Sequence, residues 1–186
     1  AALTVQRENS LSHEDVDHIE VYSFHEACRL ATWNPADTEQ AQYSLPFPVA
    51  AALVFGQVGP AEISGSSLND ERVLRLAETM QLREDASYNE IFPNDRLAHV
   101  TVHLKDGQSL TSETHRANGD PETPLSDKQI EEKFHWLADP VVGREQASKI
   151  RMLITNLGVD YSFMDMLDLL ADGVAPIQLP RRAAIA

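Results

Sequence analysis

Three of the seven histidines lie in one short stretch of the sequence: His99, His103 and His115. Clustered imidazoles are typical metal ligands, and a zinc site takes three or four ligands that are held by ordered partners behind them. His99 and His103 are four residues apart in a segment of alternating polarity, so both side chains point to the same face of a strand. One hypothesis for this cluster is therefore a metal site.

The turn at Asp106-Gly107 decides whether His115 joins the other two histidines. Both turn residues tolerate positive φ and predict a hairpin. A two-residue loop pairs His99 with Thr114, whereas a five-residue loop pairs it with His115. The alternative interpretation is that the histidines lie on the polar, solvated face of a sheet, with the apolar residues between them on the other face. We favour this interpretation and expect no metal.

The single cysteine, Cys28, follows a predicted strand and has His25 and Glu26 close to it. A Cys/His pair is one route to a nucleophile, but a free cysteine typically behaves as a small buried hydrophobe, which is the interpretation we adopt. One cysteine cannot form an internal disulfide or a CxxC zinc site. The sequence has no GxSxG, GxxxxGK[ST] or GxGxxG pattern, so nothing indicates a serine hydrolase, a P-loop protein or a Rossmann enzyme.

The composition is that of a soluble globular protein with a strong acidic excess. In 186 residues, 15 Lys and Arg stand against 29 Asp and Glu, which gives a net charge of −14. Such a charge argues against binding to nucleic acid, where affinity comes from clustered cations. The longest apolar run, residues 49–55, is far too short to span a membrane, and nothing near the start resembles a signal peptide. We expect a cytoplasmic protein with no membrane contact.

Hydrophobic periodicity predicts an α+β fold in the first two thirds of the chain. Alternation predicts strands over residues 17–24 and 97–104, with a return strand over 108–115. A short helix is expected before residue 9, a buried helix from Pro48 to a stop at Gly56, and an amphipathic helix over 69–80. Together these elements predict a small antiparallel sheet with packed helices.

The last third of the chain has only helical patterns. Helices are expected over residues 127–139, 144–157 and 163–171. The tail after Gly173 is expected to have no regular secondary structure. Because the periodicity changes near Pro124, we expect two parts: an α+β domain over residues 1–124 and a helical segment over 125–186.

Two longer stretches carry a family pattern. Residues 41–53 read AQYSLPFPVAAAL, and residues 119–126 read GDPETPLS, followed by Lys133-Phe134. Both are similar to motifs of the MmgE/PrpD family, AQ(Y/F)SLPY-x-VAxAL and GDPxxPLS…KF. Ile19-Glu20-Val21 and Asp106-Gly107 fall where the family has its I-x-V strand and DG hairpin. The chain resembles this family over nearly its whole length, with motifs that agree in order and spacing.

The resemblance implies that the chain corresponds to the α+β lid domain and the returning C-terminal helices of longer enzymes. In the family, a large helical domain carries most of the catalytic acid–base residues, and that domain is not in this chain. The first residue is Ala rather than Met, and we expect a fragment or one subunit of a split enzyme, inactive alone. Its expected partners are the large helical domain or subunit, and a second copy in a homo-oligomer, because exposed apolar helix faces usually mark contacts.

The implied activity is that of a lyase acting on small di- or tricarboxylates. Dehydration like that of 2-methylcitrate dehydratase, without a metal or other cofactor, is the reaction we favour; decarboxylation and epimerisation are the alternatives within the family. A proton is lost next to a carboxylate, which requires clamps on the carboxylates and a positioned base. The resemblance assigns no catalytic residue to this chain.

Three positions are implied to contact substrate. The family often has a Tyr after SLP that faces the substrate cleft, and here Phe47 stands in its place without the hydroxyl. Tyr43 and Ser44 lie just before it in the same motif and are expected to share this role. The alternative for all three residues, Tyr43, Ser44 and Phe47, is packing and helix capping.

A different class of function also fits the sequence. The chain can be a stand-alone, non-catalytic module that binds small carboxylates or regulates a partner. Local cations such as Arg116 or Lys133 would then bind the anion, although the net charge of −14 counts against it.

Overall fold

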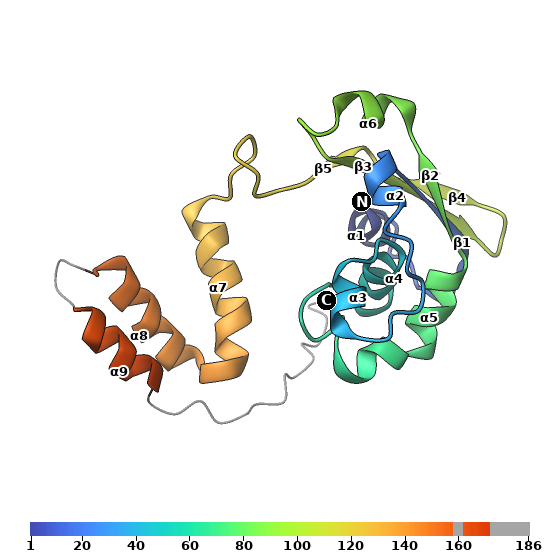
Figure 1. Ribbon diagram of the computed structural model, residues 1–186. Coiled ribbons are helices and arrows are strands. Elements are labelled where there is room, and N and C mark those ends of the chain that lie inside the picture. Colours follow the sequence, from blue (N-terminus) through green and yellow to red (C-terminus); the bar gives the residue numbers. More distant parts are fainter. Residues whose placement is uncertain (158–161, 172–186) are drawn as a thin grey trace. The chain divides into compact units, whose positions relative to one another are not determined.

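A computed structural model describes residues 1–157 and 162–171 of the chain (Figure 1). Two compact units are formed, residues 1–117 (unit 1) and the described part of 118–171 (unit 2). The division falls between Ala117 and Asn118, a few residues before the expected boundary after residue 124. The tail after Gly173 that was expected to be irregular lies outside the described residues. Within the described residues, no helix is both long enough and apolar enough to cross a membrane.

Unit 1 is an α+β structure, as predicted, built on one sheet. The strands are β1 (Val16–Ser23), β2 (Met80–Glu84), β3 (Leu97–Leu104), β4 (Ser109–Thr111) and β5 (His115–Arg116). Their order is β2-β1-β3-β4, and β5 also pairs with β3. The helices are α1 (Ala2–Glu8), α2 (His25–Cys28), α3 (Thr38–Gln42), α4 (Pro46–Phe55), the 3₁₀ turn η1 (Gly65–Asn69), α5 (Glu71–Glu78) and α6 (Ala86–Ile91).

The sheet contains the expected antiparallel strands, and one further strand makes it mixed. β3 runs antiparallel to β1, β4 and β5, but β2 pairs with β1 in parallel, with Ile19 opposite Met80. A parallel pair needs a long crossover, and the helical segment between β1 and β2 supplies it. The expected helix over 69–80 stops at Glu78 instead, because Met80 already belongs to β2. Met80 to Arg83 do alternate between apolar and polar residues, but Met80 was assigned to the end of the expected helix and no strand was expected here.

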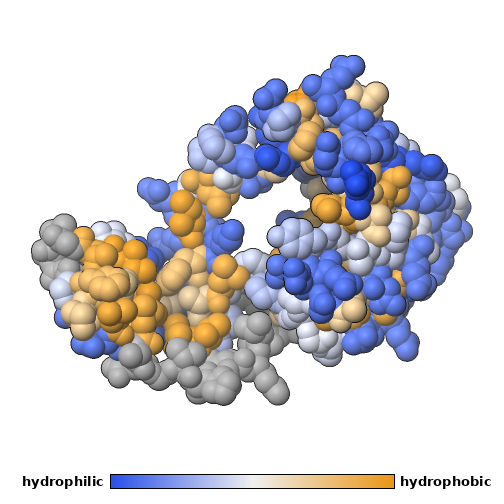
Figure 2. Space-filling view, in the orientation of Figure 1, coloured by the Kyte–Doolittle hydropathy of each residue, from blue (hydrophilic) through white to orange (hydrophobic). Residues whose placement is uncertain are grey.

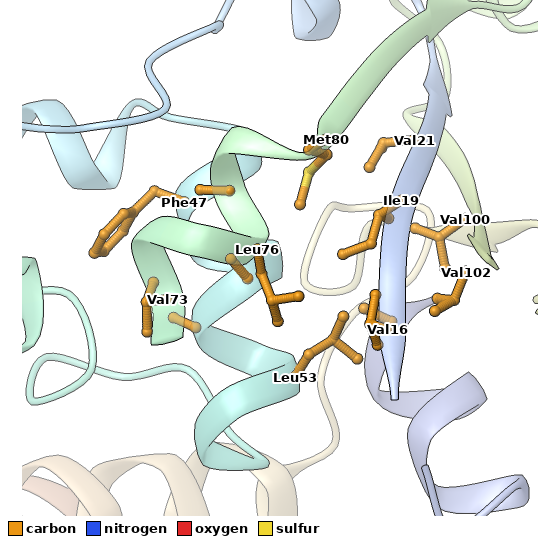
Figure 3. Packing of buried hydrophobic residues seen from close by; sticks show 14 of the residues in the cluster. Val16, Ile19, Val21, Phe47, Leu53, Val73, Leu76, Met80, Val100 and Val102 are labelled. Atoms are coloured by element: carbon orange, nitrogen blue, oxygen red, sulfur yellow. The ribbon is translucent and has the colours of Figure 1, made fainter. Parts of the chain in front are cut away.

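The core lies between one face of the sheet and the helices α1, α4 and α5 (Figures 1 and 3). Burial alternates along β1 and β3, as the sequence pattern predicted. Figure 3 shows the apolar side chains of the sheet and of the helices meeting in this layer. The sheet and the helices contribute these fully or nearly fully buried residues, among others: Val16, Ile19, Val21, Val100 and Val102, then Leu53, Val73 and Leu76.

Helix α4 is the most apolar element of the chain, and its two ends follow from local rules. Pro46 occupies the first helical turn, where its missing N–H costs nothing, so the helix begins two residues before the expected start at Pro48. Gly56 ends the helix with a φ of 73°, a left-handed conformation that glycine adopts without strain. Six of its ten residues are buried, so the helix is enclosed rather than laid on a surface.

The described part of unit 2 contains three helices, close to the predicted ones: α7 (Asp127–Val142), α8 (Arg144–Thr155) and α9 (Phe163–Ala171). Helix α7 begins with a capping box in which Ser126 and Gln129 satisfy each other's backbone amides. It continues through Pro140 to Val142, three residues beyond the expected end at Asp139. The described helices α7 and α8 bury only three residues in total, Ala147, Ile150 and Leu153. The described helices of unit 2 therefore pack around a small apolar core.

Truncation of Leu53 tests the central position of α4. Leu53 is 1% exposed, so Leu53→Ala should lower the free energy of unfolding of unit 1 by about 3 kcal/mol, through lost burial and the cavity left behind. Urea unfolding followed by far-ultraviolet circular dichroism measures this change. The matched control is Leu30→Ala. Because Leu30 is 44% exposed, its substitution should lower the free energy of unfolding only slightly. Equal losses in the two variants would contradict the assignment of α4 to the core.

Candidate functional site

The junction between α3 and α4 contains the three residues that the sequence singled out as substrate-binding. Helix α3 begins at the N-cap Asp37, whose carboxylate accepts a hydrogen bond from the Gln40 amide at 2.8 Å. It ends at Tyr43, and α4 begins two residues after Ser44. The two helices therefore follow each other with almost no loop, which leaves little freedom to the residues between them.

Ser44 joins this junction to the preceding loop. Its hydroxyl donates to the Thr32 carbonyl at 2.6 Å and accepts from the Phe47 amide at 3.0 Å. The Leu45 amide donates to the Leu30 carbonyl at 2.8 Å. Ser44 is 6% exposed, and its contacts are those of a residue that caps the first turn of α4.

Tyr43 and Phe47, which lie four residues apart on either side of the junction, differ completely in exposure. Tyr43 is 67% exposed, and within the described residues its hydroxyl has no hydrogen-bond partner. Phe47 is fully buried as part of the core of unit 1, and Figure 3 shows it at the end of that cluster away from the sheet. In this arrangement the accessible hydroxyl of the junction belongs to Tyr43.

Two pairs of stacked rings lie on the sheet face that α1, α4 and α5 leave uncovered. His18 of β1 lies opposite His103 of β3, with ring centroids 4.1 Å apart. Tyr22 lies opposite His99, with centroids 4.5 Å apart. The structure thus places His99 and His103 on the polar face of the sheet, as predicted.

Glu20 lies between the two stacked pairs and connects three strands. Its carboxylate accepts from the Tyr22 hydroxyl at 3.0 Å and from Arg83 at 3.3 Å, and it lies 3.3 Å from Nε2 of His103. Nδ1 of His103 lies 2.8 Å from the Ser109 hydroxyl. Burial alone would raise the pKa of Glu20, but the hydrogen bonds of Tyr22, His103 and Arg83, together with the Arg83 charge, hold the pKa below its ordinary value.

His115 does not join the other two histidines. Near the turn His103 pairs with Ser109, which corresponds to a three-residue loop. Farther from the turn the strand pairing shifts by one residue, so that His115 lies opposite Ala98. This places His115 on the face opposite to that of His99. Neither loop length considered from the sequence describes the whole hairpin, and the return strand expected over 108–115 is broken into β4 and β5. Within the described residues, no three His, Cys, Asp or Glu side chains are grouped so that they could hold a metal ion.

Cys28 is half-buried at the carboxyl ends of β1 and β2. Its Sγ lies 3.4 Å from the Arg83 carbonyl, and burial, followed by the charge of Glu84, raises the pKa of the thiol. Nδ1 of His25 lies 2.8 Å from the Glu84 carboxylate. A thiol with a raised pKa is a poor nucleophile, so the geometry favours the structural interpretation of Cys28.

Sequence patterns missed two groups of hydrogen-bonded side chains. Tyr88 of α6 is 7% exposed, and its hydroxyl lies 2.8 Å from Nδ1 of His99 and 2.7 Å from the Thr114 hydroxyl. No local signal reveals this group, because it depends on how α6 packs on the sheet. In unit 2, Nδ1 of His135 lies 2.7 Å from Asp139 on the same helix, a pair that the four-residue spacing of these two types would have indicated.

The two cations that the alternative function required differ in their surroundings. Arg116 forms an ion pair with Asp95, so its charge is already balanced. Lys133 is exposed on α7. They lie in different units and do not form one anion site within either unit.

Replacement of Glu20 tests the polar network on the open face. Because the folded pKa of Glu20 is lowered, its stabilisation is present above the ordinary value of 4.5 and is lost as pH falls through the folded pKa. The difference in free energy of unfolding between the natural chain and Glu20→Gln should therefore shrink on acidification, as measured by urea unfolding of unit 1. Glu113→Gln, at an exposed position, is the control. If the difference in free energy of unfolding between the two chains instead grew as pH falls, this would contradict the hydrogen-bond network assigned to Glu20.

Comparison with known proteins gives a family and one curated relative. Residues 1–158 match the model of the MmgE/PrpD C-terminal domain. The chain is also similar to cis-aconitate decarboxylase of Homo sapiens, with 24% identity over 142 residues, which are 76% of this chain and 29% of that protein. The chain thus spans less than a third of the length of this curated relative. Since the family match covers far more than half of the chain, and agrees with the motifs at 41–53 and 119–126, the chain belongs to the MmgE/PrpD family.

Proposed function

We propose that this chain is the C-terminal, lid-forming part of an MmgE/PrpD-type lyase that acts on small di- or tricarboxylates in the cytoplasm. The observation that carries the proposal is the family match over residues 1–158. The similarity to cis-aconitate decarboxylase supports lyase chemistry on a small carboxylate. Dehydration of a 2-methylcitrate-like substrate, without a metal, is the reaction that we propose, with decarboxylation as the competing one.

We propose that the reaction requires groups beyond those that the described residues supply. Removal of a proton next to a carboxylate needs cations or hydrogen-bond donors on the carboxylates and a positioned base. In the described residues, Arg83, Arg116 and Arg151 each pair with an acidic side chain, which lowers their value as clamps. We therefore propose that the rest of the enzyme supplies the base and most of the clamps, and that this chain is inactive alone.

The α3–α4 junction is the proposed contribution of this chain to the substrate site. Tyr43 presents a free hydroxyl at the surface, suited to a hydrogen bond with a carboxylate. Ser44 holds the first turn of α4 against the loop through Thr32, so that the junction stays in place. Phe47 forms the apolar support beneath it.

Unit 2 presents the surface that we propose for the rest of the enzyme. Of the large apolar side chains that are exposed in the described residues, most lie in unit 2, all but Leu157 on its helices: Ile130, Leu137, Met152, Ile154, Leu157, Phe163, Met164, Leu167 and Leu170. Figure 2 shows these helices as largely hydrophobic on the visible face. Between α7 and α8 lies a groove of about 530 Å³, lined in part by Ile130, Phe134 and Ile154. Exposed apolar area of this kind usually marks a contact with another protein surface, and pairing of two copies is the competing occupant.

An assay of the chain alone and of its mixture with the N-terminal part of a family enzyme tests the proposed activity. We expect no turnover by the chain alone and turnover in the mixture. Ultraviolet absorbance of the new conjugated double bond reports dehydration of 2-methylcitrate or citrate, and CO₂ release reports decarboxylation of cis-aconitate. Binding of the two parts is measured first by calorimetry. A mixture that associates but turns over none of these substrates contradicts the proposed function, as does activity of the chain alone.

Substitutions in the groove test the proposed contact surface. Ile130 and Ile154 are 54% and 53% exposed, so Ile130→Asp and Ile154→Asp should leave the fold intact. Each should weaken binding of the N-terminal part by at least about tenfold, roughly 1.4 kcal/mol, because a carboxylate would be buried in an apolar contact. The control is Lys149→Glu, at a residue on α8 that does not line this groove. Equal binding by all variants would place the contact elsewhere.

A further inference from the structure

Asn118-Gly119 is the only Asn-Gly pair in the sequence, and it opens unit 2 directly after β5. Both residues are exposed. Within the described residues the Asn118 carboxamide has no hydrogen-bond partner. Gly119 has a φ of 98°, and a Cβ placed on it would meet only Leu125, at 3.8 Å. The backbone beside the Asn118 side chain is therefore open to close approach.

A loop hydrogen bond restrains the same backbone nitrogen. The Gly119 amide donates to the Thr123 carbonyl at 2.9 Å, and the Thr123 amide donates to the Asp120 carbonyl at 2.9 Å. Pro121 lies inside this small closed loop and limits its backbone freedom. The proton on the Gly119 nitrogen is thus held until the loop opens locally.

We propose that Asn118 is a site of spontaneous deamidation whose rate is set by opening of the Gly119–Thr123 hydrogen bond. The Gly119 nitrogen attacks Cγ of Asn118, the bond from Cγ to the side-chain nitrogen breaks, and ammonia leaves with the proton given up by the Gly119 nitrogen. One water molecule then opens the resulting succinimide at either carbonyl, which gives aspartate or isoaspartate. Water is the only co-reactant, and no atom changes its oxidation state overall.

The modification changes the start of unit 2 in two ways. Either product adds one negative charge to a chain whose net charge is already −14. Isoaspartate also routes the backbone through the side-chain carbon, which lengthens the chain by one atom where it passes from one unit to the other. Asparagine is among the residues that proteins of hyperthermophiles avoid because of this lability.

Incubation of the full chain at mildly alkaline pH tests the proposal. The readouts are the mass gain from exchange of NH₂ for OH, located by peptide mapping, and the isoaspartate content. A synthetic peptide of residues 115–121, which lacks Thr123, runs in parallel, with Asn118→Gln as the control. We expect the natural chain to deamidate at Asn118 several-fold more slowly than the peptide, and Pro121→Gly to deamidate faster than the natural chain. No mass gain at Asn118 while the peptide reacts, equal rates in chain and peptide, or no acceleration in Pro121→Gly would each overturn the proposal.

Discussion

Burial of α4 against one face of the sheet is the interaction on which the rest of unit 1 depends. The helix has apolar residues on all sides, and six of its ten residues are buried while the other four are partly buried. One side is covered by α5 and α1, and the other faces the valine and isoleucine side chains of β1 and β3. Because this arrangement uses one face of the sheet completely, the opposite face is left to polar side chains.

The polar face is organised by hydrogen bonds rather than by burial. Strand pairing places His18 against His103 and Tyr22 against His99, and Glu20 connects these stacked pairs to Arg83 on β2. These groups bond mainly to one another, which explains why an array rich in histidine forms no metal centre among the described residues. The histidine cluster that stood out in the sequence is therefore best understood as part of the sheet's own surface.

The two units use their apolar residues differently. Unit 1 encloses most of its large apolar side chains, whereas the described helices of unit 2 leave many of theirs at the surface. Exposed apolar faces of this kind usually mark a contact with another protein surface. In the proposed enzyme, these helices and the exposed Tyr43 would contact the N-terminal part, so that binding of the two parts would also complete the substrate site.

The sequence by itself determined the family, the α+β class, the strands β1 and β3, and the C-terminal end of α4, because each depends on local periodicity, on glycine, or on a contiguous motif. Tertiary structure alone decided three other features. β2 joins the sheet in parallel where the sequence pattern placed the end of a helix, because β1, distant in sequence, supplies its hydrogen bonds. The register shift in the hairpin separates His115 from His99. Tyr43 faces outward and Phe47 inward because Ser44 fixes the junction between two helices. This constraint depends on the hydrogen bond from Ser44 to the carbonyl of Thr32, a contact that the residue types alone do not reveal.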